Sequence, residues 1–324
     1  LWALQAHLDE RLLLAQYYLA PDGIYLQALT RGHQQLTKIP VEKTRLLQLL
    51  ERWRSALHSP KALTPEALAA SQQLFILLIK PLDELRAGHP HLWVMPSAEL
   101  WDLPFETLMD DGNHYLLESA GCAYLGPSEA MQMAQDPGRT GGFWLGASNL
   151  SLPGTAQEIT RLKALFPDAR EIRHWGELQS LASQAGILHL ATHSQARPDR
   201  ATESTVELAE GPVPMEQIYT LNLRSGSLVV LRSCSGSVPQ THRERDLISL
   251  SSGFRAAGAS TVIAALWPID DEATVPFFAP MYRALQQNQS RLQALRQAKL
   301  TMLAQPQYAH PYYWSGFTLL GDGR

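Results

Sequence analysis

Two residues with nucleophilic and acid–base chemistry, His193 and Cys234, each follow closely after a short apolar run. His193 comes two residues after the run Ile187–Ala191, and Cys234 comes three residues after Leu228–Leu231. Both runs are typical of buried strands in a parallel sheet, where the carboxyl ends of neighbouring strands meet and face a ligand. The separation of 41 residues (234 − 193 = 41) leaves room for one crossover connection. We therefore expect the thiol and the imidazole to lie side by side.

A thiol beside an imidazole forms an acyl-transfer pair. The imidazolium stabilises the thiolate, which lowers a cysteine pKa that starts near about 8.5, and the same ring then protonates a leaving amine. For these two residues alone, the commoner alternative is a small core cysteine and an ordinary loop histidine. The segments around them are needed to choose between the two interpretations.

The second half of the chain alternates short apolar runs with helical patterns, which predicts an α/β fold with a mainly parallel sheet flanked by helices. A capping box, Thr155 with Glu158, favours a helix that starts at Thr155. The segment Ser194–Pro214, rich in charged residues and proline, is predicted to be an exposed loop next to the pair. Strands are expected at Phe143–Ala147, Ile187–Ala191, Leu228–Leu231 and Ser260–Ala265, and helices at Thr155–Phe166, Leu247–Ala257, Glu272–Gln287 and Ser290–Ala304.

The first half of the chain is predicted to be a second α/β layer. Leucine spacing predicts the end of a helix over residues 1–16, and we take residues 1–10 as the remnant of an upstream helical module. The turn-rich segment 136–142 is the expected linker, so the domains are 11–135 and 143–324. Expected elements are a hairpin of Tyr17–Leu19 and Ile24–Leu29, helices at Val41–Leu57 and Thr64–Lys80, and strands at Leu92–Met95 and Tyr115–Leu125.

Four ordered motifs resemble the CHAT family of caspase-like cysteine peptidases, which are related to separase and often fused to tetratricopeptide repeats. The resemblance implies a caspase-like catalytic lobe over 143–324 and an amino-terminal pseudo-caspase α/β lobe without catalytic residues. The motifs are His189–His193, Leu228–Gly236, Gly253–Asp271 and His310–Phe317, and Val94–Ser97 with Leu103–Leu108 extends the match upstream.

The family resemblance assigns roles to the pair. His193 would be the base and Cys234 the nucleophile, with the backbone N–H groups of Ser194 and Cys234 forming the oxyanion hole. The chain departs from the family at Ser194, where glycine is usual, so the backbone there must avoid positive φ. It departs again at Arg232–Gly236, where Ser-Ala-Cys-Glu-Thr-Gly is common in the family.

The separase-like pattern around Asp271 implies a pocket for a basic side chain. A carboxylate there would bind a guanidinium or ammonium group on the residue before the scissile bond. The alternative is that Asp270 or Asp271 caps the helix that begins at Glu272. Asp246 is a weaker second candidate, and Trp267 is expected either to wall the pocket or to pack in the core.

Composition excludes several other functions. The chain has 27 basic and 31 acidic residues, a net charge of −4, so we expect no direct nucleic-acid partner. The longest apolar run, Leu74–Ile79, is too short to cross a bilayer, and we expect no membrane partner. His189 and His193 are predicted to lie on one strand, where residues four positions apart are separated by about 13 Å. They therefore cannot both coordinate the same zinc ion. We expect His189 to be half-buried, and we expect no metal or other cofactor.

These observations predict a cytoplasmic, bacterial cysteine endopeptidase that cleaves a protein substrate after a basic residue. Two cysteines in 324 residues favour a reducing compartment, and Cys122 is expected to be inert core. An upstream helical-repeat module is the expected regulatory partner. Two alternatives stay open, an inactive scaffold in which Ser194 marks a lost oxyanion hole, and a peptidase for neutral side chains.

Overall fold

The computed structural model describes residues 5, 8–126, 143–148, 155–195, 197, 202–232 and 243–324 of the chain. At residues 98, 143, 148, 243–249 and 271 it describes the backbone alone. The linker predicted at 136–142 lies outside the described residues. The chain divides into two compact units, one of residues 1–135 with 303–315 and one of residues 136–302 with 316–324.

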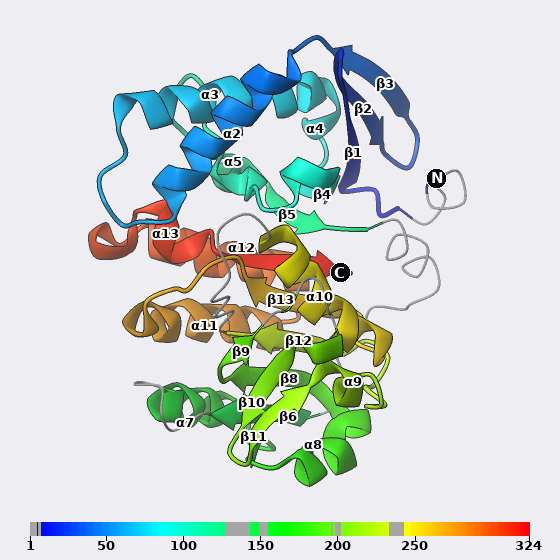
Figure 1. Cartoon of the computed structure of the whole chain (residues 1–324), viewed down its shortest axis with the longest axis vertical. Coiled ribbons are helices and arrows are strands. Elements are labelled where there is room, and N and C mark those ends of the chain that lie inside the picture. The colour runs from blue at the N-terminus through cyan, green and yellow to red at the C-terminus, as the bar shows by residue number, and fades with distance from the viewer. Residues whose placement is uncertain are drawn as a thin grey trace. The chain divides into compact units, whose positions relative to one another are not determined.

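The first unit contains a sheet and several helices (Figure 1). Its strands are β1 (Leu12–Ala20), β2 (Gly23–Leu29), β3 (Gln34–Ile39), β4 (His91–Met95) and β5 (Gly121–Tyr124), and its helices are α2 (Lys43–Leu57), α3 (Pro65–Leu78), α4 (Asp83–Arg86), α5 (Leu116–Ser119) and α13 (Pro311–Trp314). The strand order is β3-β2-β1-β4-β5. The pairs of β1 with β4 and of β4 with β5 are parallel, whereas β1, β2 and β3 form an antiparallel meander.

Local sequence signals position several of these elements. The Thr64 side chain accepts a hydrogen bond from Ala67 N at 3.2 Å and caps α3, with Pro65 in the first turn. Gly23 closes the β1–β2 hairpin with a φ of +144°, a value that favours glycine. The predicted hairpin and both predicted helices are therefore confirmed.

Two predictions for the first unit are wrong. Residues 12–16 were expected to end a helix but begin β1, because a run of leucines buried on both faces suits a strand with neighbours on each side. The single strand expected at Tyr115–Leu125 is divided into α5 and β5. The Glu118 carboxylate accepts from Tyr115 N at 2.8 Å, which stabilises the helical turn before the strand.

The second unit is the α/β layer predicted from the alternating pattern. Its strands are β6 (Phe143–Ser148), β7 (Arg170–Ile172), β8 (Ala185–Ala191), β9 (Ser194–Gln195), β10 (Thr205–Leu208), β11 (Gly211–Pro214), β12 (Leu228–Leu231), β13 (Thr261–Ala265) and β14 (Phe317–Gly321). Its helices are α7 (Thr155–Leu165), α8 (Trp175–Leu181), α9 (Met215–Ile218), α10 (Arg243–Ala256), α11 (Asp271–Gln286) and α12 (Arg291–Leu303). The larger sheet of this unit has the order β14-β13-β12-β8-β6-β7, and β14 alone among these described strands runs antiparallel to its neighbour.

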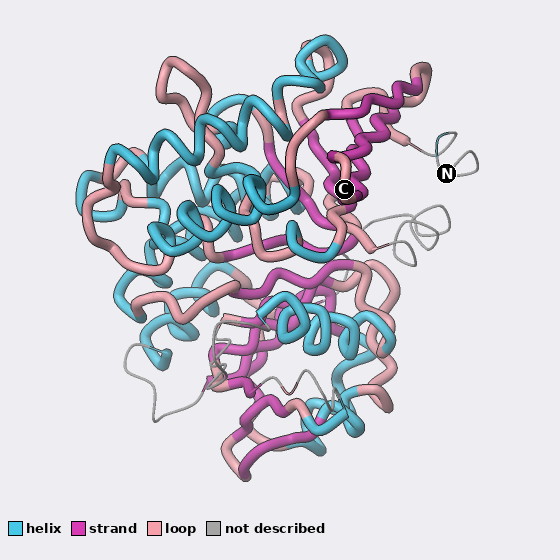
Figure 2. Tube along the Cα trace, turned by 45° about the horizontal axis from the view of Figure 1, so that its top comes forward, coloured by secondary structure: helices cyan, strands magenta, loops and turns pink. Residues whose placement is uncertain are grey.

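Helices cover both faces of this sheet, as Figures 1 and 2 show. On one face α7 packs against β6 and α11, and on the other α10 packs against β13 and α9. The core between them is largely aliphatic and aromatic, with Trp144, Phe254 and Phe277 fully buried. The predicted strands and helices of this unit are confirmed to within a few residues at their ends.

The segment Ser194–Pro214 was expected to be a loop, and that prediction is wrong for its described residues. β9, β10 and β11 form a small antiparallel sheet of their own. Val206, Leu208 and Val213 are buried in it, and they alternate with more exposed residues as strands require. The proline and charged residues of the segment concealed this period of two.

Among all described helices of the chain, none is both long and apolar enough to cross a membrane.

The stability of the first unit should fall as the pH drops from 7 to 5, because of His310. This half-buried side chain caps α13 by accepting from Tyr312 N at 3.1 Å, and burial lowers the pKa of His310 from 6.5. Below pH 6.5 the unfolded chain takes up a proton that the folded chain resists, so stability is lost as the pH decreases.

We expect His310→Asn to keep the cap at pH 8 and to reduce this pH dependence, since asparagine is a good cap that does not titrate. Urea unfolding midpoints at pH 8, 7, 6 and 5 measure the difference between the two proteins. Parallel pH profiles for the two proteins would contradict the prediction.

Candidate functional site

The carboxyl ends of β8 and β12 lie side by side in the second unit. In their parallel pairing Val230 is opposite His189, and Leu231 is opposite Leu190. The pairing continues past the end of β12, where Arg232 N donates to Leu190 O at 3.1 Å. The offset between paired residues is 41 (231 − 190 = 41), which equals the separation of His193 from Cys234. The two strand ends that lead to the predicted pair are thus neighbours in matching register.

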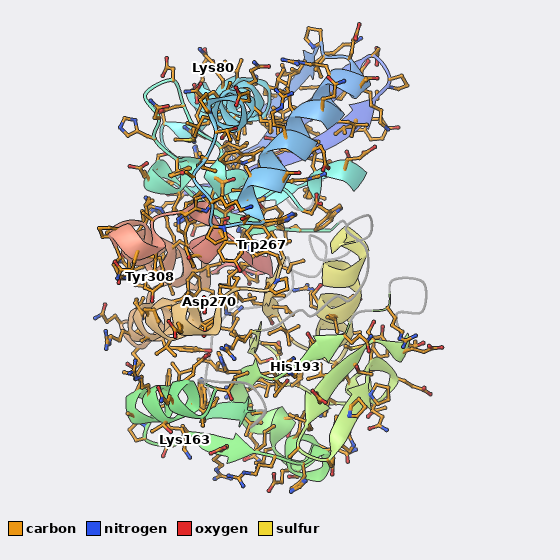
Figure 3. The ribbon with its side chains drawn as sticks, turned by 60° about the vertical axis from the view of Figure 1, so that its left-hand side comes forward. Lys80, Lys163, His193, Trp267, Asp270 and Tyr308 are labelled. Atoms are coloured by element: carbon orange, nitrogen blue, oxygen red, sulfur yellow. The ribbon has the colours of Figure 1, made fainter. Side chains whose placement is uncertain are left out.

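His193 lies just beyond β8, partly exposed, at the junction between two sheets. Thr192, the residue before it, is buried. The carbonyl oxygen of His193 accepts from Glu207 N at 2.8 Å, so the backbone here is held by β10 as well as by β8. Figure 3 shows the His193 side chain at this position. The backbone of His193 is therefore flanked by paired strands on both sides, β8 before it and β9 after it.

Ser194 stands where the family usually has glycine, and its backbone needs no strained conformation. It lies in β9 opposite Val206. Glu207 N in β10 donates to the carbonyl oxygen of His193, so His193 and Glu207 form a hydrogen-bonded pair of the antiparallel ladder. In the next pair, Ser194 with Val206, the backbone N–H groups point away from the opposite strand. Among described non-glycine residues, Asn113 and Asn288 have positive φ, and Ser194 does not. A serine can therefore orient its N–H as a glycine would.

Cys234 lies outside the described residues, in the segment 233–242 that separates β12 from α10. Arg232 is the last described residue before it. The other cysteine of the chain, Cys122, is in β5 of the first unit and is 4% exposed, as expected for a core residue. Asp246 lies in the first part of α10, residues 243–249, of which only the backbone is described.

The segment after β13 contains the residues predicted for a specificity pocket. Asp270 Oδ1 accepts from Glu272 N at 2.9 Å, so Asp270 caps α11, the alternative role considered for it. Asp271 is the first residue of that helix, and its side chain is outside the described part. Trp267 is 3% exposed and packs against Gly316, where an added Cβ would lie 3.0 Å from the indole ring. Trp267 is thus a packed side chain in this structure.

A buried polar cluster lies next to the carboxyl ends of β8 and β12, and it was not predicted from the sequence. Glu158 Oε1 is 2.9 Å from His189 Nε2, and Glu158 Oε2 is 2.9 Å from Arg232 Nε. These three side chains are 1%, 0% and 3% exposed. Thr274 donates to Glu158 Oε2 at 3.0 Å, and Tyr282 OH is 2.7 Å from His189 Nδ1. We call Glu158, His189, Arg232, Thr274 and Tyr282 the polar cluster.

Two predictions are corrected by the polar cluster. His189 was expected to be half-buried but is completely buried. Glu158 was expected to reach back to Thr155 in a capping box, but its carboxylate faces β8 and the end of β12. A histidine in an otherwise apolar buried strand was the available signal, because a buried imidazole needs polar partners from elsewhere in the chain.

Each ring nitrogen of His189 faces a different partner in the cluster. The carboxylate of Glu158 accepts, so Nε2 of His189 carries the proton. Burial, followed by the charge of Glu158, raises the pKa of Tyr282 well above 10.0, so its hydroxyl keeps a proton to donate to Nδ1. Both ring nitrogens of His189 therefore have a hydrogen-bond partner. The charges of Glu158 and Arg232 balance each other.

The sequence profile of the CHAT domain family matches residues 68–322. Two curated relatives are similar over shorter stretches. Tetratricopeptide repeat protein 28 from Mus musculus is 32% identical over 102 residues, and the protein of the same name from Homo sapiens is 33% identical over 95 residues. These stretches cover 32% and 29% of this chain and 4% of each relative. The chain therefore spans a small fraction of the length of these relatives.

Two solved structures share the fold. They are chains in crystal structures of the Saccharomyces cerevisiae separase–securin complex, at 3.0 and 2.6 Å resolution. The TM-scores are 0.62 and 0.58, and the sequence identities are 10% and 9%. Each match covers 98% of this chain and about a third of the solved chain, 30% and 31%. This likeness confirms the predicted α/β fold with a mainly parallel sheet flanked by helices.

Proposed function

Because the chain belongs to the CHAT family, we propose that it is a cysteine endopeptidase in which Cys234 is the nucleophile and His193 the general base. One observation carries the proposal. The two strands that lead to these residues are adjacent and parallel, with a register offset equal to the separation of the pair. His193 comes three residues after Leu190, and Cys234 comes three residues after Leu231, which lies opposite Leu190 in the sheet.

The proposed reaction proceeds through an acyl-enzyme. His193 takes the proton of the Cys234 thiol, and the thiolate attacks the scissile carbonyl carbon. The N–H groups of Ser194 and Cys234 stabilise the resulting oxyanion. The C–N bond then breaks as His193 gives its proton to the leaving amine. Water, deprotonated by His193, attacks the thioester, which releases the acid and regenerates the thiol.

We propose that the residue before the scissile bond is basic. Asp271 at the start of α11 is the candidate carboxylate for a guanidinium or ammonium group, and Asp246 in α10 is the second. Asp270 is exposed, and its Oδ1 accepts the capping hydrogen bond from Glu272 N. Its negative charge therefore also lies at the start of α11. Trp267, buried as it is, would support such a pocket from behind through packing. A protein substrate agrees with the endopeptidase role.

We propose regulation by a helical-repeat module in the full protein. The curated relatives are tetratricopeptide repeat proteins in which the similar stretch is 4% of the length. A cytoplasmic location is part of the proposal, because the chain has two cysteines and no disulfide framework. The bacterial origin expected above stays a prediction, since these relatives are from Mus musculus and Homo sapiens.

A peptidyl-arginyl fluoromethyl ketone tests the proposal directly. The Cys234 thiolate should displace fluoride and form one thioether adduct, which intact-mass measurement and peptide mapping would locate. Cys122, buried in the first unit, is the internal control and should stay unlabelled until the protein is unfolded. A matched probe with norleucine in place of arginine should react at least about tenfold more slowly, in line with a charged specificity contact.

The alternatives give different results in the same experiment. A native protein that forms no adduct, although iodoacetamide labels both cysteines after unfolding, would be the inactive scaffold. Equal rates with the arginine and norleucine probes would indicate a peptidase for neutral side chains.

A further inference from the structure

One buried carboxylate contacts both strands of the proposed site. Glu158 projects from α7 onto the sheet, where its two oxygens bind different strands. Oε1 is 2.9 Å from His189 in β8, and Oε2 is 2.9 Å from Arg232 at the end of β12. His189 precedes His193 by four residues, and Arg232 precedes Cys234 by two. The segments that continue into the proposed pair are thus joined by a single side chain.

Helix α11 adds a second connection to the same group. Thr274 donates to Glu158 Oε2 at 3.0 Å and accepts from Arg232 Nε at 3.1 Å. Tyr282, two helical turns further along α11, contacts the other nitrogen of His189. The polar cluster therefore connects α7, α11, β8 and the end of β12. The same α11 begins at Asp271, the residue proposed to bind the substrate.

Stability alone is a weak reason for a buried ion pair at this place. Removing two charges from water is costly, and apolar residues of similar size often give equal or greater stability. Neighbouring β-strand residues on the same face, such as Trp144 stacked on His189 with ring centroids 5.9 Å apart, are already well packed. The ion pair instead fixes the relative position of the two side chains, because a carboxylate and a guanidinium bind at defined distances and angles.

We propose that Glu158 is a positioning residue, which fixes the spacing of the two strand ends so that His193 and Cys234 meet at the substrate. This role rests on the proposed peptidase function. Glu158 itself does not touch the substrate or the reacting atoms. Its effect on catalysis passes through His189 on β8 and through Arg232 on the segment that leads to the nucleophile.

The test separates positioning from stability with a charge-neutral pair of substitutions. Glu158→Gln alone removes the negative charge that balances the buried guanidinium of Arg232, so the variant should unfold at lower urea concentration. The double variant E158Q/R232M removes both the carboxylate and the guanidinium from the polar cluster, and the glutamine can still accept from His189 and donate to Thr274. We expect its urea midpoint to return to that of the parent protein.

Catalysis should not return with stability. For the double variant we expect kcat on an arginyl peptide to stay about 100-fold below that of the parent protein, with KM changed less than about threefold. A misplacement of about 1 Å between reacting groups has an effect of this size. Recovery of kcat together with the urea midpoint would overturn the positioning role.

Arg291→Met provides a matched control. Arg291 is also a buried arginine of the second unit, and it bonds Thr261 Oγ1 at 2.5 Å at the opposite, amino-terminal end of β13. This variant should lower the urea midpoint but leave kcat and KM of the folded protein unchanged. If the parent protein neither cleaves the peptide nor reacts with the arginyl probe, the proposed function fails and the positioning role falls with it.

Discussion

Replacement of Cys234 by alanine should reduce kcat/KM for an arginyl peptide amide by a factor on the order of 10⁴ or more. The proposed reaction has no other nucleophile, and the loss of a nucleophile in comparable hydrolases leaves only the contribution of binding and the oxyanion hole. Release of a fluorescent amine from the peptide measures the effect. The free energy of unfolding, measured in urea, should change by no more than about 1 kcal/mol, so the variant stays folded.

Cys122→Ala is the control for this variant. Its thiol is buried in β5, so the substitution should cost some stability but leave the activity of the folded protein intact. Activity that survives in the Cys234 variant and disappears in the Cys122 variant would reverse the assignment. Activity that survives in both would exclude cysteine catalysis altogether.

Replacement of His193 by alanine should also reduce kcat/KM by a factor on the order of 10⁴, because the thiol then loses its base and the leaving amine loses its acid. The two residues act as one unit. The double variant with Cys234→Ala should therefore be no less active than either single variant, within about tenfold. Steady-state kinetics of the three variants under one set of conditions checks both statements.

His114→Ala is a suitable control because His114 is an exposed histidine of the first unit, paired with Asp110 at 3.4 Å. We expect kinetics like those of the parent protein. A loss in the double variant equal to the product of the two single losses would show that His193 and Cys234 act independently, contrary to the proposed mechanism.

Much of the second unit could be predicted because its sheet is buried on both faces. The runs Ile187–Ala191 and Leu228–Leu231 have few polar residues, so a central parallel strand is the arrangement that removes them from water. Their order along the chain, with helical patterns between them, limits the topology further. The resemblance to the CHAT family, recognised in four motifs, is confirmed by the match over residues 68–322.

Predictions failed where several structures suit the same residues. Residues 12–16 have leucines that fit a helix as well as a strand, and the partners β2 and β4 decide for the strand. In Ser194–Pro214 the composition of a loop conceals buried valines and a leucine at alternate positions of two strands. Asp270 fits a pocket and a helix cap equally well by residue type, and the hydrogen bond to Glu272 N shows that it serves as the cap.

The order and spacing of residues were enough to predict that the strands leading to His193 and Cys234 are neighbours, and the parallel pairing of β8 with β12 at an offset of 41 residues confirms that part of the prediction. The partners of His189 were not accessible in this way. Glu158 lies 31 residues before it and Tyr282 lies 93 residues after it, on helices that reach the strand only when the sheet is assembled. Whether a buried polar group is satisfied depends on groups brought close by folding, so the tertiary structure alone decided which carboxylate joins the two strands.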